Sequence, residues 1–193
     1  TFIDITTNYH DSDYIKDRAI LTTKNVDVED INQQILKKIS NTEEFEYFFA
    51  DLVEDKAQVD QSLYLTEFLN TLTPSRMLSY HLILKKDVSV ILLCNLDPSE
   101  RICNADSDFP FQFERRQFPI RLSFAITINK AQDQIILIME LYLPKPVFSY
   151  GQLYVALSKV QLKDNIKVIV KDGHIKGKKD VYTRNIVYKE VFY

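Results

Sequence analysis

Short apolar runs that end in polar clusters recur along this chain. Residues 19–21 are apolar and lead into Thr22-Thr23-Lys24-Asn25, after which Val28, Ile31, Ile35 and Ile39 recur at nearly helical spacing. A short apolar run is typical of a buried strand, and apolar residues at helical spacing are typical of a helix that buries one face. We therefore predict a strand at Ala19–Leu21, an exit loop, and a helix whose first turn Asp27 can cap.

The C-terminal half repeats this alternation. Apolar runs predict strands at Leu122–Ile126, Ile135–Leu143 and Ile166–Val170, and prolines end the second of them. Ser149 and Gln152 have the Ser-x-x-Gln spacing of a capping box, which predicts a helix that continues to Val160. Strands that alternate with helices in this way favour an α/β fold with a mainly parallel sheet flanked by helices.

The segments between these elements are less regular. Ser40–Gln61 is acidic and is expected to be a long exposed loop or a short helix. The remaining segments are expected to be a helix at Leu63–Leu72, two strands or one interrupted strand at Leu82–Leu84 and Val88–Leu93, a loop at Ile102–Asp108, and a final apolar segment packed on the sheet at Asn185–Phe192.

Charge is distributed unevenly along a chain whose net charge is -3. Residues up to Asn104 include 10 Lys and Arg against 18 Asp and Glu, whereas residues from Ala105 onward include 14 against 9. A polyanionic partner would therefore meet the C-terminal half, although an uneven solvated surface would give the same asymmetry.

Several classes of protein are disfavoured by composition. Cys94 and Cys103 fit neither a zinc pattern nor a disulfide framework, and the three histidines have no ligand spacing, so we expect no metal site and a reducing intracellular location. The sequence shows no signal peptide and no long apolar run, so we expect no membrane partner.

A polar cluster follows the predicted strand at Leu122–Ile126. It supplies a hydroxyl, three amides and a cation, from Thr127, Asn129, Gln132, Gln134 and Lys130. Such groups can bind phosphate oxygens without reading base sequence. Taken alone, Lys130 is equally consistent with a solvated surface lysine.

Two further basic sites have both a functional and a structural interpretation. Arg115 and Arg116 lie among four phenylalanines, a mixture that can stack on and neutralise single-stranded nucleic acid, or whose rings can simply fill the core. Lys159, near the end of the predicted helix, can face a nucleotide held by a neighbouring domain, or can be a charge that suits the helix dipole.

These stretches resemble a known family. The segment QFPIRLSFAITINKAQDQ, together with FSYGQLYVALSKV, is similar to the last motifs of Pif-type superfamily-one DNA helicases, in particular the branch associated with Helitron transposons. RAILTTKNVDVEDINQQIL resembles that family's entry to its second RecA-like domain. LKKDVSVILLCNLDPSERICN resembles the segment leading into a small β-barrel, and NIVYKEVF resembles the C-terminal ending.

The resemblance implies a fold and an activity. Such helicases hydrolyse ATP with Mg²⁺ between two RecA-like (P-loop NTPase-type) domains while moving 5′ to 3′ along single-stranded DNA. It assigns Thr127, Lys130 and Gln132 to a motif near DNA and the ATP site. It assigns Gly151 to Lys159 to the motif that carries the arginine finger, so that Lys159 and Gln152 are the expected catalytic residues. It also implies a nuclear location and roles in replication, repair, recombination, telomere maintenance or transposition.

The resemblance also implies a division of the chain. Residues 1–80 correspond to the first part of the second RecA-like domain with its acidic loop, 81–108 to a remnant of the inserted β-barrel, and 109–193 to the remainder of the domain. The barrel is expected to be truncated, because the similarity to the family's sequence ends after Asn104.

The departures from the family are specific. The sequence contains no G-x-x-x-x-G-K-[ST] loop, the finger arginine is Lys159, and Asp87 and Asp133 stand where the family has glycine. We therefore expect the C-terminal part of a helicase that lacks its N-terminal ATPase half, with no cofactor of its own, no catalysis alone and only weak binding of single-stranded DNA. The alternatives are a non-catalytic DNA-binding module and an inert transposon-derived relic.

Overall fold

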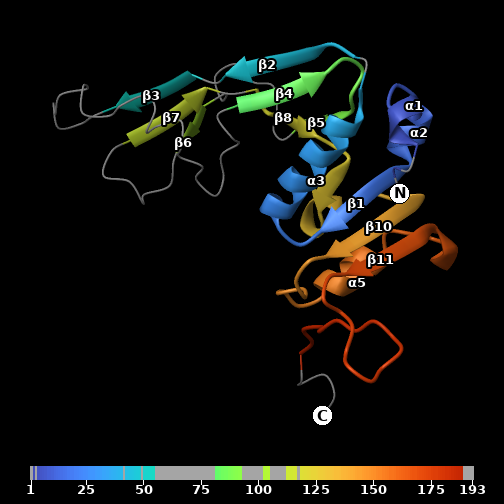
Figure 1. The fold of residues 1–193 in the computed structure, drawn as a ribbon. Helices are drawn as coiled ribbons and strands as arrows, with labels where there is room; N and C mark the ends of the chain where they lie inside the picture. The colour runs from blue at the N-terminus through green and yellow to red at the C-terminus, as the bar shows by residue number, and fades with distance from the viewer. Residues whose placement is uncertain are drawn as a thin grey trace. The chain divides into compact units, whose positions relative to one another are not determined.

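The computed structural model of this chain describes residues 2, 4–40, 42–48, 50–54, 81–92, 102–104, 112–116 and 118–188 (Figure 1). Contacts divide the chain into two units. Unit 1 comprises Thr1–Thr42, Asp87–Ser89 and Leu122–Tyr193, and unit 2 comprises Glu43–Lys86 and Val90–Arg121. The described residues 43–48 and 50–54 thus belong to the same unit as β4 (His81–Lys85), and the division expected at residues 80 and 108 stays a prediction.

Unit 1 is built on a four-stranded parallel sheet. Its strands are β1 (Arg18–Thr22), β9 (Ala125–Thr127), β10 (Ile138–Leu143) and β11 (Ile166–Val170), in the spatial order β11-β10-β1-β9. Each strand is joined to the next through a helical connection, as parallel pairing requires. The predicted α/β class with a mainly parallel sheet is confirmed.

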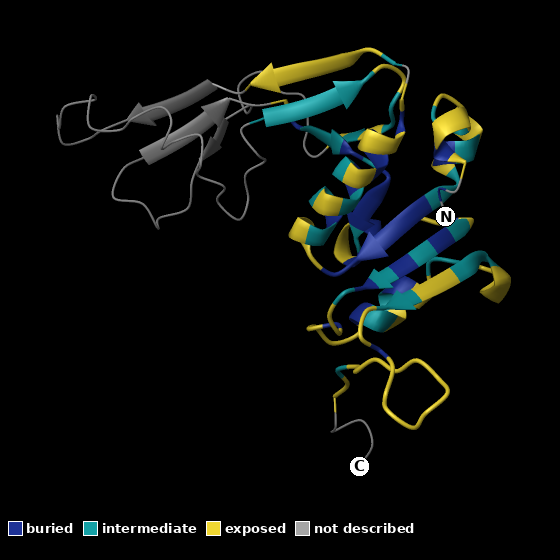
Figure 2. Cartoon of the chain, viewed as in Figure 1, coloured by how far each residue is buried: buried dark blue, intermediate teal, exposed yellow. Residues whose placement is uncertain are grey.

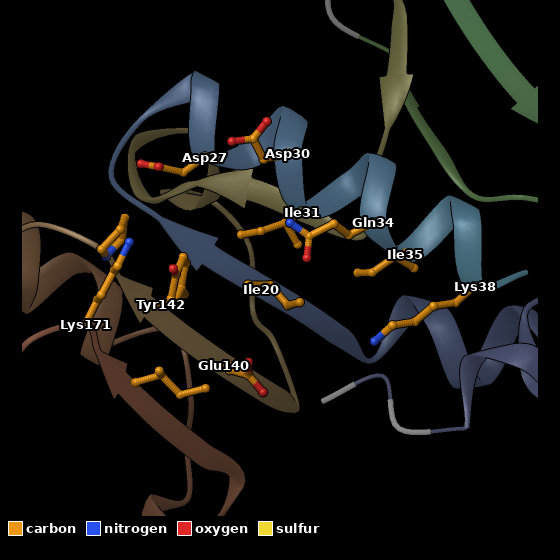
Figure 3. Close-up of a pocket in the computed structure, with 12 residues that line it drawn as sticks. Ile20, Asp27, Asp30, Ile31, Gln34, Ile35, Lys38, Glu140, Tyr142 and Lys171 are labelled. Carbon is orange, nitrogen blue, oxygen red and sulfur yellow. The ribbon is translucent and has the colours of Figure 1, made fainter.

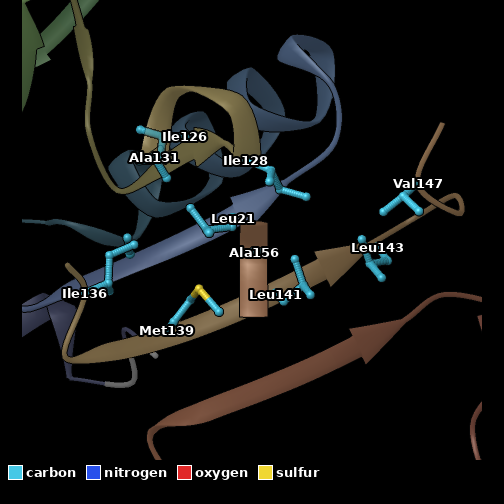
Figure 4. Packing of buried hydrophobic residues seen from close by; sticks show 11 residues of the cluster. Leu21, Ile126, Ile128, Ala131, Ile136, Met139, Leu141, Leu143, Val147 and Ala156 are labelled. Atoms are coloured by element: carbon cyan, nitrogen blue, oxygen red, sulfur yellow. The ribbon is translucent and has the colours of Figure 1, made fainter. Parts of the chain in front are cut away.

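Helices cover both faces of this sheet. The long helix α3 (Asn25–Lys38) lies over one face, which carries Ile20, and buries Val28, Ile35 and Leu36. The alternate residues Leu21, Met139 and Leu141 point to the other face, into a core shared with Ala156 of α5 (Gln152–Leu157), as Figure 4 shows. The short helices α1 (Ile5–Asn8) and α2 (Ser12–Lys16) precede β1, and single 3-10 turns, η2 (Ile128–Ala131) and η3 (Lys163–Asn165), follow β9 and precede β11.

The predicted cap of α3 is wrong. The helix begins at Asn25 after Lys24, and no side chain caps its first turn. Asp27 lies inside that turn, where a carboxylate still suits the positive end of the helix dipole.

The predicted strand at Leu122–Ile126 is in fact interrupted. It divides into β8 (Ile120–Leu122) and β9, with Ser123 and Phe124 between them. The buried side chain of Asn32 in α3 bridges this break. Its amide nitrogen donates to the carbonyls of Leu122 (3.0 Å) and Ala125 (3.3 Å), and its oxygen accepts from the Ala125 N–H (2.8 Å). Within the break, the Phe124 carbonyl still accepts from the Ile20 N–H of β1 at 3.0 Å.

The second apolar run and its helix are also shorter than predicted. β10 begins at Ile138 rather than Ile135, whose side chain is exposed. The capping box does not form, because the Gln152 oxygen accepts from the Phe148 N–H at 3.2 Å, and Gly151 precedes the helix with φ of 71°. That left-handed conformation favours glycine, and the helix ends at Leu157.

Three strand pairs of unit 2 are antiparallel. β2 (Glu44–Phe48) pairs with β4 (His81–Lys85), and β3 (Ala50–Glu54) and β6 (Ile102–Asn104) flank β7 (Gln112–Arg116). β5 (Val90–Leu92) pairs with β8. The expected loop or helix at Ser40–Gln61 is therefore wrong over β2 and β3, as is the expected loop at Ile102–Asp108 over β6. The two strands expected at Leu82–Leu84 and Val88–Leu93 are present, and the helix expected at Leu63–Leu72 lies outside the described residues.

The C-terminal segment after β11 is mostly irregular. An isolated bridge joins His174 to Val181, and the Tyr182 N–H donates to the Gly173 carbonyl at 2.8 Å. Residues 185–188 form neither strand nor helix, and all except Ile186 are exposed, so the packed apolar segment expected there is not found in this described part. None of the described helices has the length and apolar character needed to cross a membrane.

Candidate functional site

The candidate site lies where β1 and β9 end. Thr22 and Thr127 are register partners on these neighbouring parallel strands, so the two strand ends lie side by side. Open α/β sheets bind ligands at the carboxyl ends of their strands. The polar cluster predicted after β9 therefore lies at the edge of the sheet where α/β folds bind their ligands.

Two buried hydroxyls mark the same edge. Thr22 is fully buried and Thr23 is 4% exposed, and neither hydroxyl has a hydrogen-bond partner among the described residues. A buried polar group without a partner destabilises the fold, so these two hydroxyls have free hydrogen-bonding capacity for a water or a ligand. The sequence interpretation treated both residues as part of an exit loop. Two consecutive hydroxyls at the carboxyl end of a buried strand were the signal that could have identified them.

The turn η2 presents the predicted phosphate-binding residues outward. Ile128 and Ala131 are fully buried and anchor the turn, whereas Asn129, Lys130 and Gln132 are exposed. Thr127 is half-buried and does not cap the turn with its side chain. The structure thus brings four of the predicted residues together on one turn.

Lys159 is attached to the same loop. Its ammonium donates to the main-chain carbonyl of Gln132, and its own carbonyl accepts from the Ile136 N–H at 3.0 Å. The candidate finger cation is therefore held against the segment that follows η2. A nucleotide phosphate would have to compete with the Gln132 carbonyl for this cation.

Gln152 lies apart from Lys159. It begins α5, whereas Lys159 follows the helix end, and six helical residues span about 9 Å. Gln152 is 3% exposed, and its amide nitrogen is buried without a partner among the described residues, although its oxygen is bonded to Phe148. The two expected catalytic residues are thus at opposite ends of one short helix.

Arg115 and Arg116 belong to unit 2. They are residues of β7, in register with Asp51 and Ala50 of β3, and the structure does not describe their side chains. Their expected part in DNA binding stays a prediction.

A groove of about 480 Å³ opens on the α3 face of the sheet (Figure 3). Its charged lining is mixed, since Asp27, Asp30 and Glu140 face Lys38 and Lys171. Neither sign dominates, so the groove has no preference for a polyanion. The described residues include no group of three or more His, Cys, Asp or Glu side chains that could hold a metal ion.

Comparison with curated proteins identifies helicases. The chain is 38% identical over 58 residues to the ATP-dependent DNA helicase PIF6 of Trypanosoma brucei brucei, and 40% identical over 75 residues to the ATP-dependent DNA helicase RRM3 of Saccharomyces cerevisiae. These matches cover 30% and 37% of this chain, but only 7% and 10% of the two helicases. No family model matches the chain.

Solved structures agree on the fold. The Pif1 helicase of Candida albicans superposes with a TM-score of 0.56 at 18% identity, over 79% of this chain and 44% of that one. The Bacteroides Pif1 structure bound to single-stranded DNA superposes with a TM-score of 0.52 at 22% identity, over 80% of this chain and 42% of that one. These superpositions show that the chain shares its fold with Pif1 helicases, and the curated matches show that part of its sequence is similar to ATP-dependent DNA helicases, as the motifs predict.

Proposed function

We propose that this chain acts as the second RecA-like domain of an ATP-dependent 5′-to-3′ DNA helicase, and that by itself it binds single-stranded DNA without hydrolysing ATP. The family resemblance supports a nuclear DNA substrate and ancestry in the Helitron-associated branch. The chain spans a tenth or less of the curated helicases that it matches, so their activity is proposed for it only in this form.

The observation that carries the proposal is the paired strand ends. Thr22 and Thr127 adjoin at the carboxyl edge of the sheet, beside a turn that exposes Asn129, Lys130 and Gln132. A cation surrounded by hydroxyl and amide groups suits a phosphate backbone and reads no base. One of the superposed Pif1 structures holds single-stranded DNA, which supports this choice of ligand.

The proposed absence of catalysis rests on the residues available to bind a nucleotide. The sequence has no phosphate-cradling G-x-x-x-x-G-K-[ST] loop, so ATP and Mg²⁺ would have to be held by another RecA-like domain. Gln152 and Lys159 are the residues that this chain would offer to that nucleotide. Phosphoryl transfer depends on positioning and charge stabilisation, and one half of the site supplies too little of either.

Binding is tested by fluorescence anisotropy with a labelled oligo-dT strand over a range of salt concentrations. We expect weak binding that falls as salt rises, since phosphate contacts release counterions. Lys130→Ala should weaken binding and reduce the slope of log affinity against log salt by roughly 0.7, the value for one phosphate contact on a single strand. Lys37→Ala, an exposed lysine in the last turn of α3, is the matched control and should change neither quantity. An absence of binding at low salt would contradict the proposal.

Catalysis is tested by measuring ATP hydrolysis with and without single-stranded DNA. We expect no hydrolysis that depends on DNA. A DNA-stimulated rate that Lys159→Ala abolishes would show that the chain is an active enzyme.

A further inference from the structure

We propose that Tyr150, Tyr154 and Tyr188 form a nucleobase-stacking site for single-stranded DNA, separate from the polar cluster after β9. The proposal rests on the proposed function, since it assumes that single-stranded DNA is the partner. It adds a second point of contact, made with bases rather than with phosphates.

The three tyrosines surround one hollow of unit 1. The rings of Tyr150 and Tyr188 are stacked, with centroids 3.9 Å apart and planes 14° apart. A hollow of about 270 Å³ lies beside them, lined by these two residues with Tyr154, Gly151 and residues 185–187. A side-chain carbon added at Gly151 would meet no atom within 4 Å, so this wall of the hollow is open.

The side chains of the three tyrosines are exposed to solvent. Tyr154 is 76% exposed, Tyr188 57% and Tyr150 52%. Large aromatic rings usually bury most of their area, so three of them grouped at the surface indicate a binding surface. Every nucleobase has a π face, and exposed tyrosines stack on bases without regard to sequence.

Charge favours nucleic acid over a protein partner. Every residue of the segment 171–184, which leads directly into the hollow at Asn185, is exposed apart from Gly173, as its yellow trace in Figure 2 shows. It carries five cations against two carboxylates, namely Lys171, Lys176, Lys178, Lys179 and Arg184 against Asp172 and Asp180. Lys178 lies over the Tyr182 ring at 4.6 Å, and the excess of positive charge suits phosphates on either side of a stacked base.

The test compares two strands of equal length by anisotropy with the full chain, one oligo-dT and one abasic. Both carry the same phosphates, but only the first has bases. We expect the chain to prefer oligo-dT by roughly tenfold, the scale of one base–aromatic stack. Tyr154→Ala combined with Tyr188→Ala should remove the preference and leave the affinity for the abasic strand unchanged. Tyr47→Ala, an exposed tyrosine of unit 2, is the matched control and should keep the preference.

Each other result has a distinct meaning. Equal binding of the two strands by the unaltered chain overturns the stacking site and leaves the proposed phosphate contacts in place. Failure to bind either strand overturns both proposals. A double variant that weakens binding to both strands equally shows that the tyrosines act on folding or on phosphates. If the unaltered chain sediments as a dimer, and the double variant is a monomer with its preference for oligo-dT intact, the surface joins two copies of the chain instead.

Discussion

The two units differ in how their strands are held. In unit 1, β10 alternates between half-buried and buried residues, and Met139, Leu141 and Leu143 are fully buried. In unit 2, every residue of β2 is exposed and every residue of β4 is half-buried. Wherever the structure describes burial, the buried aliphatic and aromatic side chains belong to unit 1, apart from that of Pro119. A rigid site therefore has its support in unit 1, which is where the paired strand ends lie.

Aromatic pairs take the place of a core in the described part of unit 2. Tyr47 meets Phe118 edge to face at 5.7 Å between ring centroids, and Phe48 stacks on His81 at 4.8 Å. All three of these Tyr and Phe side chains remain more than a third exposed. Such pairs contribute about 0.5–1.5 kcal/mol each beyond their burial, far less than a packed core. Figure 2 shows this difference between β1 and β10, which carry dark blue, and β2 and β4, which are yellow and teal.

The largest expected effect tests this difference directly. Leu141→Ala in β10 should lower the free energy of unfolding by about 2–5 kcal/mol, because it leaves a cavity in a fully buried core. Leu92→Ala in β5, where the side chain is 48% exposed, is the same chemical change in unit 2 and should cost less than about 1 kcal/mol. Urea denaturation followed by circular dichroism measures both. Equal losses would show that the two units depend on one shared core.

The parallel sheet could be predicted because its strands correspond to short apolar runs in the sequence. The strands β1 and β10 are short apolar or alternating runs, as expected in a parallel sheet covered by helices, and the edge strand β11 is an apolar run interrupted by Lys167. The motif residues after β9 could also be placed, because a polar cluster that follows a strand must lie at the sheet edge. The pattern of apolar and polar residues supported both inferences.

Unit 2 could not be predicted in the same way. Residues 44–48 alternate glutamates with Phe45 and Tyr47, a strand pattern that the run of acidic residues obscured. The strand exists because it pairs with β4, more than thirty residues further along the chain. Non-local pairing of this kind leaves little trace in local propensity.

Parts of the site were hidden for a related reason. The adjacency of Thr22 and Thr127 depends on the strand order, which joins residues a hundred positions apart. The bond from Lys159 to the Gln132 carbonyl involves a main-chain atom, which no side-chain pattern records. The bonds that join α3 to the ends of β8 and β9 come from the side-chain amide of Asn32, which lies about ninety residues earlier in the chain.

That amide gives the second prediction. Asn32→Ala should lower the free energy of unfolding of unit 1 by about 2–3 kcal/mol, since it leaves the Ala125 N–H and two carbonyls buried without their partner. The neighbouring Gln33→Ala removes only a bond of 3.2 Å to Glu29 and should cost less than about 0.5 kcal/mol. Urea denaturation measures both losses. A small loss for Asn32→Ala would mean that β8 and β9 hold their positions without α3, and that unit 1 depends on side-chain burial alone.

The smallest effect concerns the part of unit 1 that lies between the two stretches of unit 2. Asp87 has φ of 64°, a left-handed conformation in which an aspartate is strained and glycine is not. The family resemblance predicts glycine here. Asp87→Gly relieves this strain, which outweighs the added freedom of the unfolded chain, so it should raise the free energy of unfolding by about 0.5–1 kcal/mol. Asp133 is the matched control, because the resemblance predicts glycine there too, yet among the described residues only Asp87 and Asp172 are non-glycine residues with positive φ. Asp133→Gly should therefore lower the free energy of unfolding by up to about 1 kcal/mol, through the added freedom of the unfolded chain. Thermal unfolding of both variants measures the sign of each change in stability. A gain for both would show that the benefit comes from the loss of negative charge rather than from the backbone conformation at Asp87.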